Sequence, residues 1–101
     1  MYFVNISVPP SVSSSPSDAV RVLGQSITFQ CGFHGNPPPR IEWYHGKSSK
    51  FSPVPSIPKY ITTGGTLRIT SISIEDEGTF LCKGINVAGT ANATAYLNVQ
   101  G

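Results

Sequence analysis

Charge is scarce in this sequence, and the charged residues that it has are scattered. Asp, Glu, Lys and Arg make up 12% of the 101 residues, about half of the usual share in soluble domains. The seven basic residues form no stripe of the kind that binds nucleic-acid phosphates. Their densest group, Lys47 and Lys50 with His45, fits the solvated face of a hairpin. We therefore expect no nucleic-acid partner.

Long hydrophobic runs and helical patterns are also missing. No stretch approaches the roughly 20 apolar residues that cross a bilayer, so we expect no direct membrane insertion. No helix-length window repeats apolar residues at i, i+3, i+4 and i+7. Instead, 10 glycines and 9 prolines interrupt a sequence that is 39% hydrophobic. This balance favours a single domain of short strands joined by turns, an all-β fold.

The sequence is equally poor in groups that carry out catalysis or bind metals. It has two histidines, His34 and His45, and five acidic residues. It contains neither a His-Glu-x-x-His motif nor closely spaced Cys and His ligands. Gly64 and Gly65 lack the residues that would follow in a phosphate-binding loop. We therefore expect a protein without enzymatic activity, metal ion or cofactor.

Alternation of apolar and polar residues is present instead, and it is typical of half-buried strands. Trp43, for example, is predicted to point inward, while Glu42 and Tyr44 point outward. The predicted strands cover residues 19–23, 26–33, 40–45, 59–62, 66–72, 79–85 and 90–99.

Turns and linkers are predicted from proline and glycine. We expect a turn at residues 45–48, an irregular connection or a short edge strand at 49–58, and a tight hairpin turn at Gly64 and Gly65. Residues 1–8 are predicted to be a linker that leads into an edge strand broken by proline. Residues 9–100 form the predicted domain.

The last two strands also predict their own pairing. Two alanines would lie opposite the larger Cys82 and Phe80, which divides the core volume sensibly. A slip by one residue would turn Lys83 or Asn92 inward. The predicted pairs are Ile85–Thr90, Gly84–Ala91, Lys83–Asn92, Cys82–Ala93, Leu81–Thr94, Phe80–Ala95 and Thr79–Tyr96.

The most specific pattern joins two cysteines and a tryptophan. Cys31 is followed 12 residues later by the only tryptophan, Trp43, and 51 residues later by the only other cysteine, Cys82. With these residues in place, residues 9–100 resemble the I-set (intermediate) immunoglobulin-like domains. The other residues that carry the resemblance are Gly24, residues 35–42, Gly46, Leu67, Ile69, Ile72, Asp76, Gly78, Asn86, Gly89, Leu97 and Val99.

The resemblance implies an antiparallel Greek-key β-sandwich with a disulfide between Cys31 and Cys82. Two buried reduced thiols, as in intracellular I-set domains, and a reactive pair are the alternatives. A persistent disulfide would indicate an oxidising compartment. The implied core includes Trp43, Phe80, Leu67 and Ile69.

Asp76 and Gly78 match the corner that precedes the second cysteine strand of the family. Either Lys59 or Arg68 could pair with Asp76. The family usually has a tyrosine two residues before the second cysteine, and its hydroxyl bonds to the corner backbone. Here that residue is Phe80, so this hydrogen bond is lost.

Two N-glycosylation sequons are present, Asn5-Ile6-Ser7 and Asn92-Ala93-Thr94. The predicted pairing points Asn92 into solvent, where a glycan fits. The same sheet face would expose an aromatic and aliphatic cluster among polar residues, a candidate interface for a protein partner. Alternatively, the tyrosines simply cover the sheet. The candidate interface residues are Glu42, Tyr44, Leu81, Lys83 and Tyr96.

The resemblance implies a non-catalytic interaction module from the ectodomain of a cell-surface or secreted protein, such as an adhesion molecule, a matrix protein or a receptor. Its partner would be another immunoglobulin-like domain, a protein ligand or a second copy of the chain. The alternative is an intracellular spacer, similar to the I-set repeats of sarcomeric and cytoskeletal proteins. The sequons and the low charge favour the extracellular interpretation.

Overall fold

A computed structural model describes residues 6–101, which form two packed layers of short strands with one turn of 3-10 helix. The elements are β1 (Val8–Ser14), β2 (Ala19–Val22), β3 (Ile27–Gln30), β4 (Gly32–Asn36), β5 (Arg40–Lys47), β6 (Lys50–Pro53), β7 (Tyr60–Thr63), β8 (Thr66–Ile69), η1 (Ile74–Asp76), β9 (Gly78–Asn86) and β10 (Gly89–Gln100).

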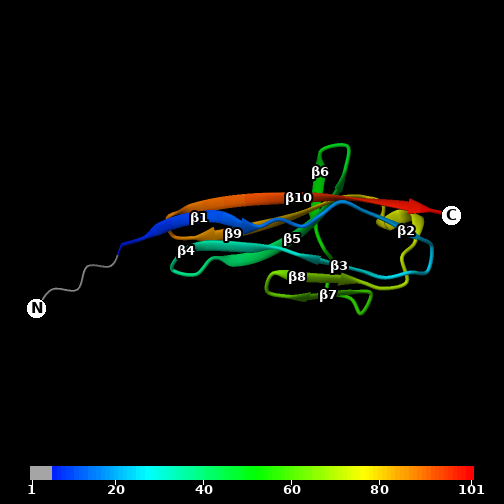
Figure 1. The fold of residues 1–101 in the computed structure, drawn as a ribbon, viewed down its shortest axis with the longest axis horizontal. Coiled ribbons are helices and arrows are strands. Elements are labelled where there is room, and N and C mark those ends of the chain that lie inside the picture. Colours follow the sequence, from blue (N-terminus) through cyan, green and yellow to red (C-terminus); the bar gives the residue numbers. More distant parts are fainter. Residues whose placement is uncertain (1–5) are drawn as a thin grey trace, which may run out of the picture.

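One layer is a sheet in the order β2-β10-β9-β5-β6, and the other has the order β3-β8-β7. Strands β1 and β4 add a two-stranded ribbon at one end of the molecule (Figure 1). All pairs are antiparallel except β2 with β10, which run parallel. The all-β sandwich predicted from the sequence is therefore confirmed.

The predicted pairing of the last two strands is confirmed at every position. Ala93 lies opposite Cys82 and Ala95 opposite Phe80, and the two alanines are 9% and 2% exposed. The outward partners also match, because Asn92 lies opposite Lys83. Small residues on β10 thus leave room for the larger core residues of β9, as the volume argument requires.

Three strand boundaries predicted from the sequence are wrong, and one of them is the end of the strand expected at 66–72, which stops at Ile69. The turn expected at residues 45–48 is part of β5, which continues to Lys47 and then turns at Ser48 and Ser49. Both serines have positive φ angles, 54° and 69°, as a two-residue hairpin turn that follows the sheet twist requires. The single strand expected at 26–33 is divided at Cys31 into β3 and β4, because β3 pairs with β8 and β4 with β1.

The core lies between the two layers. Every second side chain along a strand points into it. On β8, for example, Leu67 and Ile69 are fully buried, while Arg68 between them is exposed. The Phe29 and Phe80 rings from opposite layers are 5.4 Å apart. The other buried apolar residues are Ile27, Cys31, Trp43, Ile72, Cys82, Ala93, Ala95, Leu97 and Val99.

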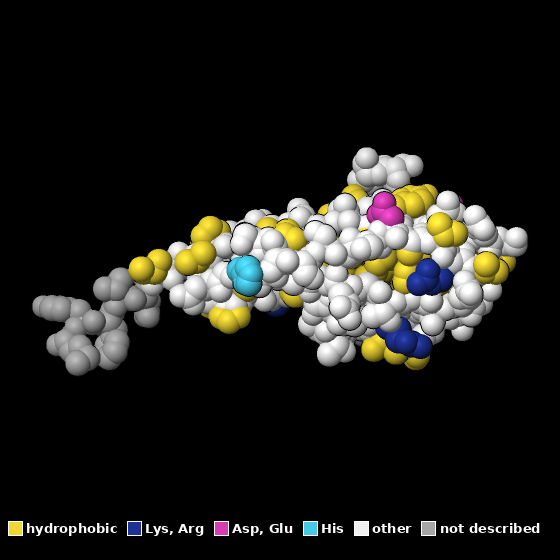
Figure 2. Space-filling model, viewed as in Figure 1, with side chains coloured by type: hydrophobic (Ala, Val, Ile, Leu, Met, Phe, Trp, Pro, Cys, Tyr) yellow, Lys and Arg dark blue, Asp and Glu magenta, His cyan; other side chains and the backbone are white. Residues whose placement is uncertain are grey.

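The described part of the molecule is elongated, and β1 begins at the opposite end of the long axis from the end of β10 (Figure 1). The β5–β6 hairpin projects from the side of the rod. Strand β1 already begins at Val8, and Asn5 lies outside the described residues. On the face seen in Figure 2, charged side chains are few and separated, with hydrophobic side chains between them.

Candidate functional site

The layers are joined by a disulfide between Cys31 and Cys82, and residues 6–101 contain no free cysteine. Trp43 is the cross-strand neighbour of Cys82 and is 5% exposed. Its indole Nε1 donates a hydrogen bond of 3.3 Å to the Gly64 carbonyl, so the polar atom of the ring is satisfied inside the core. These residues hold the sandwich together and leave no sulfur group for chemistry.

Asp76 is the one buried charged residue among those described, with 1% of its surface exposed. Lys59 forms the ion pair at 2.8 Å, and the Tyr60 hydroxyl donates to the same carboxylate. The backbone N–H of Ser73 donates a third bond of 2.8 Å. The partner of Asp76 is therefore Lys59. Arg68, the other candidate, lies on the outward side of β8.

Burial and hydrogen bonding oppose each other in setting the pKa of Asp76. Burial alone would raise the pKa, but the bonds from Lys59, Ser73 and Tyr60 outweigh it and hold the pKa below its usual range. Burial and the hydrogen bond to this carboxylate raise the pKa of Tyr60. All partners of the Asp76 carboxylate are groups of the chain itself. The carboxylate is therefore part of a structural corner and is not a free acid.

A second contact, which was not predicted from the sequence, stabilises the same corner. His45 stacks on Phe80, with ring centroids 4.3 Å apart and an interplanar angle of 7°. Its Nε2 donates to the Glu77 carbonyl at 3.1 Å. The corner thus has a side-chain hydrogen bond from β5, although Phe80 has no hydroxyl. The inward direction of Trp43 was the available signal, because residue 45 shares its side of the strand.

The predicted interface residues do lie on one face, which we call the β5–β9–β10 face: Glu42, Tyr44, Leu81, Lys83 and Tyr96. Tyr44 lies opposite Leu81, and Glu42 opposite Lys83. The Tyr44 hydroxyl donates to Glu42 at 2.8 Å, which lowers the pKa of Glu42 and raises that of Tyr44. Tyr96 is the most exposed aromatic residue of the set, at 44%.

A shallow groove of about 220 Å³ crosses this face, lined by Tyr44, Phe51, Leu81, Lys83 and Asn92; we call it the aromatic groove. Phe51 was not predicted, because residues 49–58 were expected to be either an irregular connection or a short edge strand; the structure has the short edge strand, β6. It lies opposite Gly46, where a Cβ atom would approach the Phe51 Cδ1 to 2.6 Å. Glycine at position 46 therefore allows the phenyl ring to lie against the sheet.

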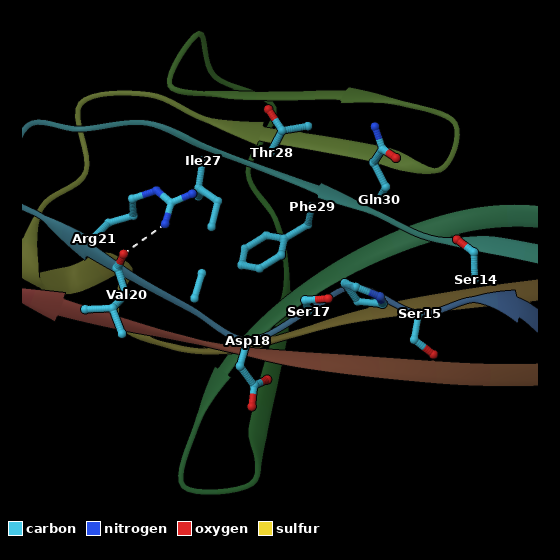
Figure 3. A pocket seen from close by; sticks show the side chains of 12 residues that line it. Ser14, Ser15, Ser17, Asp18, Val20, Arg21, Ile27, Thr28, Phe29 and Gln30 are labelled. Carbon is cyan, nitrogen blue, oxygen red and sulfur yellow. Dashed lines mark hydrogen bonds between the residues drawn. The ribbon is translucent and has the colours of Figure 1, made fainter.

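A larger hollow of about 560 Å³ lies between residues 14–21 and β3 (Figure 3). Its charged side chains already have partners. Arg21 donates to the Ser26 and Val20 carbonyls at 3.1 and 2.9 Å. Asp18 accepts from the Tyr96 N–H at 2.8 Å and points away from β3 (Figure 3). Both charged side chains of the hollow are thus held by hydrogen bonds with the backbone.

Among residues 6–101, no three His, Cys, Asp or Glu side chains come close enough together to form a metal site. No helix in this part of the chain has the length and apolar character to cross a membrane.

This geometry, two β-sheets joined by a core disulfide beside a buried tryptophan, defines an immunoglobulin-type sandwich. The family model described as "Immunoglobulin domain" matches residues 9–86. The chain belongs to this family, and the I-set resemblance is consistent with the match. The family assignment made from Cys31, Trp43 and Cys82 is therefore confirmed.

Similar curated proteins include a human peroxidasin homolog, 34% identical over 100 residues, and human Roundabout homolog 3, 33% identical over 103 residues. Each alignment covers 97% of this chain but only 6% and 7% of the relative. The chain thus corresponds to a small part of these much longer proteins.

Similar solved structures include domains of a receptor phosphatase and of titin. The Ig1-2 module of the Drosophila receptor protein tyrosine phosphatase DLAR superposes with a TM-score of 0.83 at 27% identity, over 96% of this chain and 48% of that one. Titin domains I67-I69 superpose with a TM-score of 0.80 at 30% identity, over 92% of this chain and 33% of that one.

Proposed function

We propose that this chain is an extracellular, non-catalytic protein-interaction module of a larger cell-surface or secreted protein. The observation that carries the proposal is the Cys31–Cys82 disulfide in the core, because such bonds persist in oxidising compartments. The relatives support the same assignment, since a cell adhesion molecule-related human protein is 30% identical over 98% of this chain.

The proposed contact surface is the β5–β9–β10 face. It combines Tyr44, Leu81 and the partly exposed Tyr96 with two oppositely charged cross-strand neighbours, Glu42 and Lys83. Aromatic residues among polar ones are the usual composition of a protein interface, because they bury area with little loss of rotamer freedom. The partner we propose is a protein: another immunoglobulin-like domain, a separate ligand or a second copy.

The second candidate is an intracellular spacer with reduced cysteines, and the similarity to titin I67-I69 favours it. Intact mass separates the two candidates. The protein is secreted from eukaryotic cells and weighed before and after thiol alkylation, reduction and glycosidase treatment. We expect no alkylation without reduction. Free thiols together with unmodified asparagines would contradict the extracellular assignment.

The contact surface is tested with biotinylated module that carries no glycan on Asn92, assembled on streptavidin and applied to cells. Leu81→Ser with Lys83→Glu should reduce cell staining. The matched control is Ile61→Ser with Arg68→Glu, a cross-strand pair exposed on the opposite sheet. Equal loss in both double variants would place the contact elsewhere.

A further inference from the structure

Asn92 is both a sequon residue and part of the wall of the aromatic groove. It is exposed on β10, directly opposite Lys83 of β9, and it lines the groove together with Tyr44 and Phe51. Ala93, which follows it, points into the core, and Thr94 of the sequon is exposed again. A group attached to the Asn92 amide would therefore begin at the edge of a surface that already has two aromatic rings.

The size and character of the groove restrict what can occupy it. Its volume of about 220 Å³ lies below the roughly 300–1,000 Å³ typical of sites for drug-sized ligands. Tyr44 and Phe51 offer aromatic surface, and Lys83 offers a donor at the margin. A sugar ring fits these groups, because its C–H face packs on the negative face of an aromatic ring and its N-acetyl carbonyl accepts a hydrogen bond.

We propose that Asn92 carries an N-linked glycan whose N-acetylglucosamine core lies in the aromatic groove against Tyr44 and Phe51. The proposal rests on the extracellular function proposed above. The donor is a polyisoprenyl diphosphate-linked oligosaccharide. The amide nitrogen of Asn92 forms a bond to the anomeric carbon while the bond from that carbon to the diphosphate oxygen breaks. The amide loses one proton, and polyisoprenyl diphosphate leaves.

One of the two aromatic walls, Tyr44, is held by a hydrogen bond before any sugar binds. The Tyr44 hydroxyl is bonded to Glu42, which is itself paired with Arg40 at 3.2 Å. Phe51 is 42% exposed and lies against Gly46. A surface that is already ordered loses little side-chain entropy when it is covered. The glycan would cover apolar area on Phe51 that is otherwise in contact with water.

The glycan would divide the β5–β9–β10 face. The part around Tyr44 and Leu81 would be covered, while Tyr96 does not line the groove and stays available to a protein partner. Chains that lack the glycan would present the whole face. Occupancy of Asn92 therefore sets how much of the proposed contact surface a partner can reach.

The test uses the full chain secreted from eukaryotic cells with Asn5→Gln, so that only Asn92 can carry a glycan. The melting temperature is measured for the glycoprotein, for the protein trimmed by endoglycosidase to one N-acetylglucosamine, and for Thr94→Ala, which has no sequon. We expect the glycoprotein to melt about 3–6 °C above the form without a glycan. The protein trimmed to one N-acetylglucosamine should keep most of this increase in melting temperature. The same series is measured in Phe51→Ala and in Tyr96→Ala, the control of similar exposure.

Loss of the increase in Phe51→Ala, but not in Tyr96→Ala, would support the proposal. An equal increase in all three backgrounds would overturn it, because the sugar would then not contact the groove. Secreted protein with an intact disulfide but unmodified Asn92 would also overturn it and would leave the proposed function standing. Free thiols with no glycan would contradict both.

Discussion

At the scale of single residues, Asp76 has the densest set of polar contacts in the described chain. It accepts bonds from Lys59, Tyr60 and Ser73 while it is almost fully buried. Asp76→Asn removes the charge and leaves Lys59 without its anion, so we expect a loss of about 3 kcal/mol of unfolding free energy. Urea denaturation measures this loss, and Glu75→Gln, an exposed neighbour, should change stability little.

The same residue predicts how stability depends on pH. The folded-state pKa of Asp76 lies below its ordinary value of 3.8, so its contribution is complete above the unfolded-state pKa and is lost as the pH falls through the folded-state pKa. The difference between wild type and Asp76→Asn should therefore be constant at neutral pH and shrink below about pH 4. A difference that stays the same at pH 3 would contradict this assignment.

The contact between His45 and the corner gives the second prediction at this scale. His45→Phe keeps an aromatic ring against Phe80 but removes the donor to the Glu77 carbonyl. We expect a loss of about 1 kcal/mol, the usual net contribution of one hydrogen bond. His34→Phe is the control, because His34 is exposed on β4. A thermal unfolding curve that is identical for His45→Phe and wild type would count against this role.

Alternation along β8 could have decided one question that the sequence analysis left open. Leu67 and Ile69 were expected in the core, and the residue between them must then face solvent. Arg68 could therefore have been excluded as the partner of the buried Asp76 from the period of two alone. The contact from Tyr60 to Asp76 could not be found in this way, because it depends on how the chain turns between η1 and β7.

At the scale of elements, the β7–β8 hairpin contains two adjacent glycines that are needed for different reasons, a positive φ at Gly64 and a close backbone approach at Gly65. Gly64 has a φ of +55° and nothing within 4 Å of an added Cβ, whereas a Cβ at Gly65 would overlap the Cys31 carbonyl oxygen. We expect Gly65→Ala to lose about 3 kcal/mol because backbone must move. Gly64→Ala should lose only about 1 kcal/mol, from left-handed strain. Equal losses measured in urea would show that the close approach to Cys31 does not matter.

Strand β3 has one free edge, and the hydrogen-bond pattern says which amides face it. Cys31 donates to Gly65 at 2.7 Å, so Phe29 and Ile27 also point their N–H groups toward β8. Thr28 and Gln30 then point theirs toward the hollow between residues 14–21 and β3. In native-state hydrogen exchange, we expect the Thr28 and Gln30 amides to exchange faster than those of Phe29 and Cys31. Equal protection would mean that another strand covers this edge.

The strand boundaries that were predicted wrongly have two physical causes. Division of the long strand at Cys31 results from its two different neighbours, β8 before the cysteine and β1 after it. Alternation reports which side of a strand is buried, and it does not report which strand lies beside it. The β5–β6 hairpin was misplaced because Ser48 and Ser49 are not the usual residues for positive φ angles. Phe51, and with it the aromatic groove, was missed because residues 49–58 were left between an irregular connection and a short edge strand.

At the scale of the whole molecule, the fold was predictable because several local signals agree on one arrangement. The spacing of Cys31, Trp43 and Cys82 predicted the layers, and the alanines of β10 predicted the pairing. Such agreement between local pattern and global fold is what a well-specified sequence provides. The partner was not predictable in the same way, because an interface depends on surface chemistry that the fold leaves free.

The disulfide gives the last prediction, because it closes a span of 51 residues. The chain-entropy model assigns such a crosslink about 4 kcal/mol of stability, gained mainly by restricting the unfolded chain. Reduced wild type should therefore lose about 4 kcal/mol in urea, and Cys31→Ala with Cys82→Ala should lose more, since removing buried sulfur atoms leaves a cavity. The comparison separates the crosslink from the packing.

A loss of this size is a large part of the 5–15 kcal/mol available to a typical domain, so the reduced form should be close to unfolding at 37 °C. Native-state proteolysis of reduced, alkylated protein at that temperature measures the effect directly. Rapid cleavage is the expected result, and it fits a module that needs an oxidising compartment. A reduced form as resistant as the oxidised one would instead favour the intracellular spacer, because the sandwich would then be stable without its crosslink.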